Sequence, residues 1–150
     1  MKDNNNLLSH NQWTAGEYEN YPEIFYTAPM TDRICTNDYS SIGEQSIKLT
    51  KLGSPGSYAR VSYNQSIINK TVTASVTIKT ENATVLLILL ERDGTNIIQQ
   101  RNVTVPSNSF MNISVSLEST SSNTSFGIQF NNNGDVGSFI HIDNISLTVS

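Results

Sequence analysis

Apolar and polar residues alternate with a two-residue period along most of the chain after residue 44, and no stretch of ten to twelve residues carries a sustained helical period. In segment 71–80 the even positions from Val72 to Ile78 are apolar, while the odd positions are Thr, Ser or Lys. Successive side chains of a strand point to opposite faces, so this pattern predicts a strand with one core face and one solvated face. Segment 111–117 repeats it. The chain is therefore predicted to be all-β.

Turn-forming residues separate the segments that carry strand signals. The predicted strands are residues 6–13, 44–51, 57–63, 71–80, 84–92, 96–105, 110–118, 124–131 and 138–150. Residues 92–95, Arg-Asp-Gly-Thr, predict a tight hairpin. About nine short strands of this kind favour a two-sheet antiparallel β-sandwich that occupies residues 1–150 as one domain.

Two segments depart from the alternation. Val85–Leu90 is apolar at both parities, which predicts that a loop or the N-terminal segment covers the second side of that strand. Segment 14–39 has little periodicity, yet with Trp13 it contains half of the chain's aromatic residues. An irregular connection of this length is typical of a functional loop or of a segment packed over a sheet.

Composition excludes several classes of function. Hydrophobic residues make up 37% and charged residues 15% of the chain, and 20 Ser, 18 Asn and 15 Thr fill the difference. The net charge is −4, and the nine Lys and Arg residues form no cluster, which argues against nucleic acid as a partner. The longest apolar run, residues 84–90, is far too short to cross a bilayer, so no membrane insertion is expected.

The single cysteine, Cys35, cannot form an intrachain disulfide or a cysteine-based zinc site. The first ten residues contain no apolar signal core. Seven Asn-x-Ser/Thr sequences occur, a number compatible with a cell-surface glycoprotein but only mildly above chance. As part of a larger protein, the chain is expected outside the cell, at the cell surface or on a virion.

Three motifs in order resemble the jelly-roll carbohydrate-binding modules of the galactose-binding-like superfamily, especially the cellulose- and xylan-binding type. They are Asn-Leu-Leu-Ser-His-Asn-Gln-Trp at residues 6–13, Gly-Glu-Gln-Ser-Ile-Lys-Leu-Thr at 43–50, and Phe-Ile-His-Ile-Asp-Asn-Ile-Ser-Leu-Thr-Val at 139–149. Segments 71–80 and 103–118 resemble the middle strands of such modules. The resemblance covers nearly the whole chain and implies a jelly-roll fold and glycan binding.

The resemblance also implies a structural calcium ion between the first and last strands, with Asp143 as a ligand. The acidic ligand that these modules carry near their N-terminus has no counterpart at residues 9–13. The alternative is that Asp143 accepts hydrogen bonds from backbone amides of the N-terminal segment. His141 shares the parity of Asp143 and is expected at a solvent-exposed edge.

Catalytic motifs are absent from the sequence. There is no Gly-x-Ser-x-Gly elbow, phosphate loop or His-Glu-x-x-His helix, and most acidic residues stand singly in turns or at strand ends. We therefore expect a protein that is not an enzyme, although it could accompany one as an accessory module.

Sugar binding needs aromatic rings for the apolar faces of pyranoses and polar groups for their hydroxyls. The candidate aromatic residues are Trp13, Tyr18, Tyr21, Tyr26, Tyr58 and Tyr63, and Arg60 shares a strand face with Tyr58. Gln99 with Arg101, or Gln129 with Asn131, are candidates to line a polar sheet surface.

Two functions remain open at this point. The first is a non-catalytic module that binds a polysaccharide or a cell-surface glycan. The second is a structural or receptor-adhesion domain of a phage tail or a cell-surface adhesin, in which neighbouring domains or a second copy of the chain are partners. Fold alone does not separate the two.

Overall fold

The computed structural model describes residues 7–8, 25–36, 46–81, 83–105 and 109–150. These residues contain ten strands and no helix. The strands are β1 (Phe25–Thr27), β2 (Thr31–Thr36), β3 (Ser46–Lys51), β4 (Tyr58–Tyr63), β5 (Thr71–Glu81), β6 (Val85–Asp93), β7 (Asn96–Val105), β8 (Met111–Glu118), β9 (Ser125–Asn132) and β10 (Phe139–Val149).

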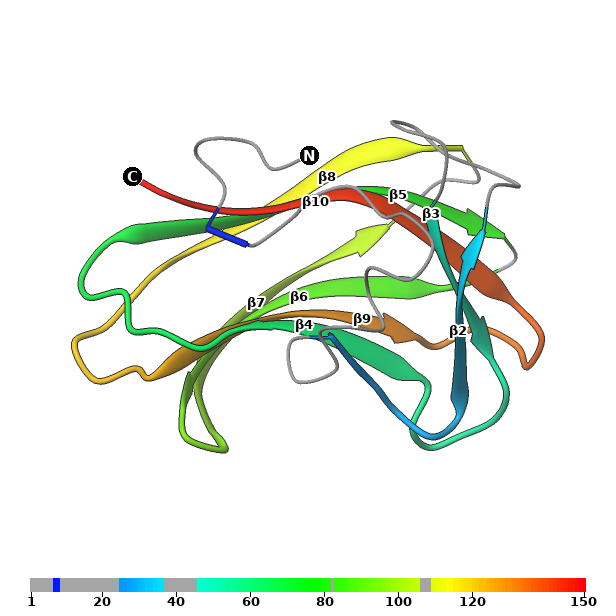
Figure 1. Ribbon diagram of the computed structural model, residues 1–150, viewed down its shortest axis with the longest axis horizontal. Coiled ribbons are helices and arrows are strands. Elements are labelled where there is room, and N and C mark those ends of the chain that lie inside the picture. The colour runs from blue at the N-terminus through cyan, green and yellow to red at the C-terminus, as the bar shows by residue number, and fades with distance from the viewer. Residues whose placement is uncertain (1–6, 9–24, 37–45, 82, 106–108) are drawn as a thin grey trace.

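The strands form two five-stranded antiparallel sheets that pack face to face (Figure 1). One sheet has the order β1-β4-β9-β6-β7, and the other has the order β2-β3-β10-β5-β8. Sequence neighbours are mostly separated in space, because the chain crosses repeatedly from one sheet to the other. The predicted all-β, two-sheet antiparallel sandwich is confirmed.

The core lies between the sheets and is built from the residues that alternation assigned to the inside. In β5 the even positions are fully buried and the odd positions are partly exposed. Phe126, Ile128 and Phe130 of β9 bring aromatic and branched side chains from the facing sheet. Burial of this apolar surface is the main source of stability in a sandwich of this kind.

The hairpin predicted at residues 92–95 connects β6 and β7. Asp93 pairs with Asn96 across a two-residue loop, and Gly94 has a φ of 60°. Positive φ in such a turn favours glycine, because in other residues the Cβ atom would crowd the neighbouring backbone. The pairing of β6 with β7 shifts register between Glu91 and Arg92, directly before this turn.

Strands β1 and β2 lie in the segment for which no strand was predicted, so that expectation was wrong for residues 25–27 and 31–36. Both are sheet edges. An edge strand has only one neighbour and one protected side, so it does not need the regular apolar alternation by which central strands are found. Exposed Asp32 and Ile34 in β2 illustrate this.

The first and last parts of the chain meet, as the resemblance implied. Leu7 donates its N–H to the carbonyl of Leu147 in β10 at 2.9 Å, and Leu8 belongs to the core. Residues 7–8 lie beside the C-terminal half of β10 (Figure 1). The rest of the strand predicted at residues 6–13 lies outside the described residues.

The expectation that His141 lies at an exposed edge is wrong, since its side chain is only 1% exposed. Its ring packs edge-on against Phe139, with 5.5 Å between the centroids. Alternation places His141 on the side of β10 opposite the core residues Ile140 and Ile142. Periodicity tells which side of a sheet a residue takes, but not whether something covers that side, and this is why the prediction failed.

Candidate functional site

The β1-β4-β9-β6-β7 sheet presents an outer face, defined here as the side turned away from the core. Tyr26 of β1 pairs with Arg60 of β4, and Arg60 pairs with Gln129 of β9. Tyr58 pairs in the same way with Asn131. Paired residues of antiparallel strands point to the same side, and the alternate residues Ala59, Val61 and Phe130 are in the core. These five polar and aromatic side chains therefore share the outer face.

Direct contacts connect these side chains. The Tyr26 and Tyr58 rings have centroids 6.0 Å apart and are tilted by 43°, and the guanidinium carbon of Arg60 lies 5.5 Å from the centre of the Tyr26 ring. Arg60 donates to Gln129 Oε1 at 3.4 Å, and Gln129 in turn donates to Asn131 Oδ1 at 2.8 Å. The result is a pair of aromatic rings beside a chain of planar polar groups.

Arg92 also belongs to this outer face, although it is not among the residues predicted to bind sugar. It pairs with Ser125 of β9 and shares its parity with Ile88 and Leu90, which lie opposite the core residues Leu87 and Leu89. Burial lowers the pKa of Arg92, the positive charge of Arg60 lowers it further, and Tyr58 acts in the opposite direction. The signal that could have found it was its parity within the β6 segment. We call Tyr26, Tyr58, Arg60, Arg92, Gln129 and Asn131 the Tyr/Arg face.

The middle of the same side of β6 is apolar and buried. Ile88 is 6% and Leu90 is 3% exposed, although neither belongs to the core between the sheets. This confirms the prediction that the strand at residues 85–90 is buried on both sides.

A hollow of about 400 Å³ lies at the end of the Tyr/Arg face. Tyr58 and Asn131 form one side of it, and the turn at residues 54–57 and Lys51 form the other. The ammonium group of Lys51 is held by the carbonyl of Gly134 at 2.7 Å. This hollow extends the face beyond its aromatic pair and adds further polar groups.

The structure brings together three of the predicted sugar-binding residues, Tyr26, Tyr58 and Arg60. Trp13, Tyr18 and Tyr21 lie outside the described residues. Tyr63, another of the aromatic candidates, is partly buried and packs against the core, so it is not part of the outer face. Asp143 lies on β10 in the other sheet.

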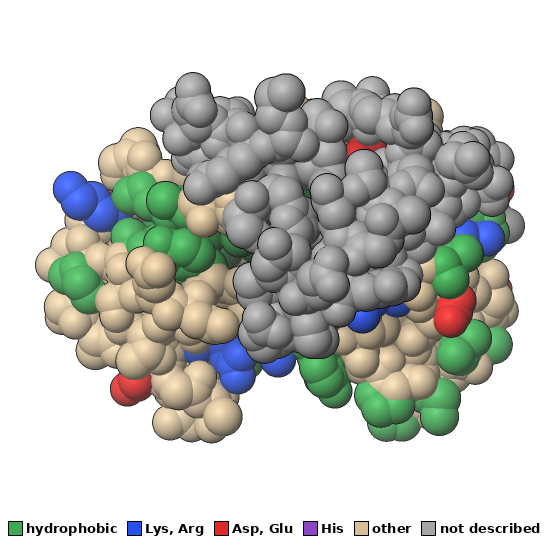
Figure 2. Space-filling model, in the orientation of Figure 1, with side chains coloured by type: hydrophobic (Ala, Val, Ile, Leu, Met, Phe, Trp, Pro, Cys, Tyr) green, Lys and Arg blue, Asp and Glu red, His purple; other side chains and the backbone are tan. Residues whose placement is uncertain are grey.

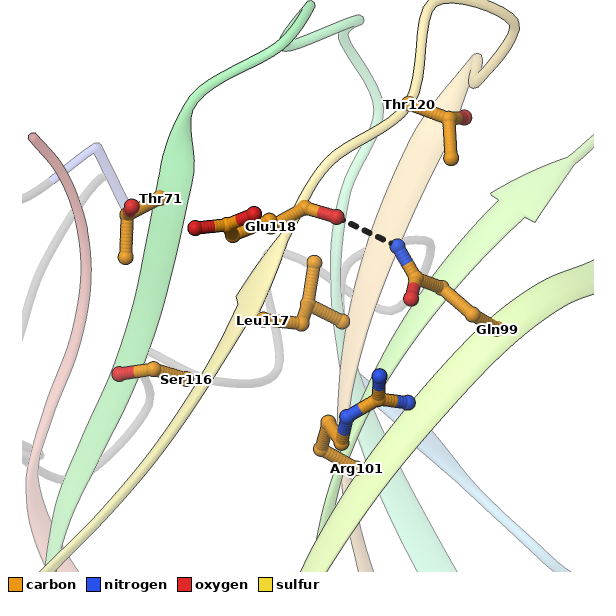
Figure 3. A pocket seen from close by; sticks show the side chains of 7 residues that line it. All are labelled: Thr71, Gln99, Arg101, Ser116, Leu117, Glu118 and Thr120. Carbon is orange, nitrogen blue, oxygen red and sulfur yellow. Dashed lines mark hydrogen bonds between the residues drawn. The ribbon is translucent and has the colours of Figure 1, made fainter.

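Gln99 and Arg101, the other pair predicted to line a polar sheet surface, lie together but on the side of β7 opposite the outer face. They pair with Glu91 and Leu89 and therefore point to the inner side of β7, at the open edge between the sheets. There they border a pocket of about 580 Å³ whose opposite wall is Ser116, Leu117 and Glu118 of β8 (Figure 3). Alternation correctly separates the two sides of β7. It does not show that β7 is the edge strand of its sheet, where the side that faces the other sheet borders an open pocket.

A buried carboxylate lies behind this pocket. Glu91 is 0% exposed and accepts hydrogen bonds from Gln99 Nε2, the backbone N–H and hydroxyl of Thr120, and Asn123 Nδ2, at 2.7–2.9 Å. Burial raises the pKa of Glu91 and is the largest single influence, but the four hydrogen bonds together lower it more, so the pKa lies below its usual value. Gln99 also donates to the carbonyl of Glu118 at 2.6 Å, the bond drawn in Figure 3. The walls of the pocket are thus fixed.

Asp143 is 0% exposed and lies within a bulge of β10 between Ile142 and Ile145. A buried carboxylate needs hydrogen-bond donors or a cation from its surroundings. The described part of the chain contains no group of three His, Cys, Asp or Glu residues that could hold a metal ion. From the described residues, a cation at Asp143 would draw oxygen ligands of other kinds, such as backbone carbonyls, which calcium accepts.

The visible surface of the described residues is mostly uncharged and polar (Figure 2). Apolar side chains on that side form separate groups rather than one broad patch, and charged side chains are few (Figure 2). Among the described residues, no helix has the length and apolar character needed to span a membrane.

No protein-family model matches the sequence, and no curated protein matches it either. Solved structures do match. The CBM22-1 xylan-binding domain of Xyn10C from Paenibacillus barcinonensis superposes with a TM-score of 0.71 at 15% identity, over 99% of this chain and 97% of that domain. TmCBM61, solved in complex with β-1,4-galactotriose, superposes with a TM-score of 0.62 at 13% identity, over 97% of this chain and 99% of that one.

The enzymatically active domain of tailspike protein 4 from bacteriophage CBA120 gives a TM-score of 0.73 at 17% identity. That match covers 97% of this chain but only 22% of the tailspike chain. At these identities the likeness concerns the fold. Together with the sheet topology, it shows that this chain has the jelly-roll β-sandwich fold of carbohydrate-binding modules, as the sequence motifs implied.

Proposed function

We propose that this chain is a non-catalytic carbohydrate-binding module and that it binds a glycan on the Tyr/Arg face. The observation that carries the proposal is the group of Tyr26, Tyr58, Arg60, Gln129 and Asn131 on one side of one sheet, linked by the contacts described above. Similarity in fold to xylan- and galactotriose-binding domains supports it.

The chemistry of the face fits a sugar. A pyranose ring has an apolar side made of axial C–H groups, which stacks on tyrosine, and a rim of hydroxyl groups, which needs donors and acceptors in fixed directions. Tyr26 is 41% exposed, so its ring is accessible. The hydrogen bonds from Arg60 to Gln129 and from Gln129 to Asn131 orient three planar groups before any ligand arrives. Such preorganisation reduces the entropy that binding must overcome.

The proposal includes a structural calcium ion with Asp143 as one ligand. Asp143 lies in the last strand, whose Leu147 carbonyl accepts the N–H of Leu7, and this supports the proposal, as does complete burial of the Asp143 carboxylate. A hard oxygen ligand suits calcium, whose role here would be to hold the first and last segments together, with no part in binding sugar.

The location that suits this function is outside the cell, where polysaccharides are found. The tailspike match favours a second setting, in which the module is a receptor-adhesion domain of a virion protein. Both settings use the same face and a glycan ligand, and they differ in the protein that carries the module.

The test is binding of the purified chain to an array of plant, microbial and host glycans, followed by calorimetry with the best ligand. Tyr26→Ala and Tyr58→Ala are each expected to weaken affinity by about tenfold or more, because a stacked ring is lost. Ser114→Ala is the matched control, since Ser114 is exposed on the opposite sheet and bonds only to Ser75 in the described structure. Failure of the wild-type chain to bind any glycan would overturn the proposal.

A further inference from the structure

The Tyr/Arg face holds two arginines and no compensating acid among the described residues. Arg60 and Arg92 stand on β4 and β6, on either side of β9, and both are only partly exposed. The outward positions of β4, β6 and β9, which alternate with core residues, contain no Asp or Glu. Two like charges that share a partly desolvated surface repel each other, and the arrangement gains stability when an anion binds.

The stem of the Arg60 side chain lies over Gly127 of β9, the residue that pairs with Leu90 of β6. A Cβ placed on Gly127 would lie 2.8 Å from Arg60 Cδ and 3.5 Å from Leu90 Cδ1, so the arginine stem crosses the glycine and approaches the side chain of Leu90. Leu90 is two residues before Arg92 on the same side of β6. The guanidinium of Arg60 contacts Gln129 and lies 5.5 Å from the centre of the Tyr26 ring, and its positive charge contributes to lowering the pKa of Arg92.

The hydrogen bonds of Arg60 leave most of its binding capacity unused. Its one bond to a side chain in the described structure is the long 3.4 Å contact with Gln129, and its Nε atom is buried and donates to no described acceptor. A guanidinium has five N–H groups in a planar fork that matches a carboxylate in two-point geometry. The single 3.4 Å contact with the amide oxygen of Gln129 occupies only one of these N–H groups.

The net negative charge of the chain contrasts with the two positive charges of Arg60 and Arg92 on this face. The chain carries −4 at neutral pH, so an anionic polymer is repelled by the molecule as a whole. Two arginines with no compensating acid among the described residues, on a face with two tyrosines, are then a selective feature rather than part of a generally basic surface. A neutral glycan would need hydrogen-bonding groups here but no excess of positive charge.

We infer that the ligand of the Tyr/Arg face is an acidic glycan, whose uronic acid carboxylate is bound by Arg60 and Arg92 while Tyr26 and Tyr58 stack on its sugar rings. This inference rests on the proposed function and names its ligand class. The carboxylate accepts hydrogen bonds from both guanidinium groups, and its charge offsets their mutual repulsion. Sugar units that precede and follow the uronate lie along the polar chain of Gln129 and Asn131.

The experiment uses polysaccharides in matched pairs. Alginate, polygalacturonate and glucuronoxylan are each compared with the same polymer after chemical reduction of its carboxyl groups, which keeps the linkages and removes the charge. We expect at least one acidic polymer to bind about tenfold or more tightly than its reduced form, and its affinity to fall as salt rises from 50 to 500 mM, as screening predicts.

Variants locate the effect. Arg60→Gln and Arg92→Gln are expected to reduce affinity for the acidic form to that of the reduced form, while Arg92→Lys, which keeps the charge but loses the fork, retains part of it. Arg101→Gln is the matched control, because it makes the same change of charge on the other side of the same sheet. Thermal melting verifies that each variant is folded.

The outcomes separate the two proposals. Equal binding of acidic and reduced polymers would overturn the acidic-ligand inference and leave the module function intact. Binding confined to sulfated polymers, included as a third set with their desulfated forms, would overturn the assignment to a carboxylate. Absence of binding to every polymer would overturn both proposals, and loss of binding in Arg101→Gln would place the site in the edge pocket.

Discussion

Arg60 lies across Gly127, and the absence of a side chain at Gly127 is what permits this position. A Cβ built on the glycine would come within 2.8 Å of Arg60 Cδ and 3.2 Å of Arg60 Cγ. These distances are shorter than carbon atoms tolerate without movement. One residue of β9 thus positions a residue of β4 on the Tyr/Arg face.

Gly127→Ala is therefore expected to displace Arg60 and weaken glycan binding by about tenfold while the fold persists. The contact partner is a flexible arginine stem, which can move, and the backbone of Gly127 has no positive φ that alanine would resist. The melting temperature should change by no more than about 4 °C. Calorimetric titration with the best ligand and a thermal melt measure the two quantities.

A double-mutant cycle distinguishes this mechanism from general disturbance of the sheet. If alanine acts through Arg60, then Gly127→Ala adds little further loss of affinity in a chain that already carries Arg60→Gln. Additive losses from the two changes would show that Gly127 matters for another reason.

Glu91→Gln is expected to lower the free energy of unfolding by about 2–4 kcal/mol at pH 7, because a buried carboxylate that accepts four hydrogen bonds loses its charge and one acceptor. Urea denaturation measures the difference. Glu118→Gln is the control, since Glu118 is exposed on the neighbouring β8 and should change stability by less than about 0.5 kcal/mol.

The pH dependence of this contribution has a definite sign. The pKa of Glu91 is lower in the folded protein than its ordinary value, so the folded state binds this proton more weakly than the unfolded state does. The stabilisation is fully present above the unfolded pKa and is lost as pH falls through the folded pKa. Wild type and Glu91→Gln should therefore converge in stability on acidification, and a constant difference from pH 7 to pH 3 would contradict this account.

The central strands and the Tyr58–Arg60 pairing were predictable because they depend on local alternation. Strands β3 to β10 fall within a residue or two of their predicted ranges, since most of them bury one side against the other sheet. Tyr58 and Arg60 share a side for the same reason. Tyr26 was selected for its ring alone, because the three-residue strand β1 that places it beside Tyr58 carries no periodicity of its own.

Contacts between distant strands could not be predicted in this way. Arg92 reaches the Tyr/Arg face because β6 lies next to β9, and Gln99 and Arg101 face an open pocket because β7 ends its sheet. Both facts are properties of strand order. His141 shows the same limit, since alternation gives its side of the sheet and strand order does not show what covers it.

Asn123 stands in an Asn-x-Ser/Thr sequence but should carry no glycan in folded protein secreted from a eukaryotic host. Its amide nitrogen donates to the carbonyl of Ile67 and to Glu91 Oε2, both at 2.7 Å, and its oxygen accepts the N–H of Ile67 at 2.9 Å. Attachment of a sugar would replace one of those N–H groups and force a bulky group into the interior.

Mass spectrometry of tryptic and chymotryptic peptides, with and without glycosidase, measures occupancy at each site. The exposed residues Asn69, Asn102 and Asn112 serve as internal positive controls, because their side chains are accessible. Substantial occupancy at Asn123 in folded, secreted material would contradict the observed burial.

Chelation tests the calcium proposed at Asp143. If a calcium ion is bound by the folded state alone, removing it lowers the melting temperature, and adding it back restores the original value. At a free calcium concentration one hundred times the dissociation constant, the ion contributes about 2.7 kcal/mol, which corresponds to a shift of several degrees for a domain of this size. Differential scanning calorimetry in EDTA and in millimolar calcium measures the shift.

Asp143→Asn separates calcium from the alternative in which backbone amides alone neutralise the carboxylate. Substitution should destabilise the protein under either arrangement, because a fully buried carboxylate loses its charge. Only the calcium site predicts that the variant also loses its response to EDTA. A wild-type midpoint that is the same in EDTA and in calcium would reject the ion, and the hydrogen-bonded arrangement would then account for the burial of Asp143.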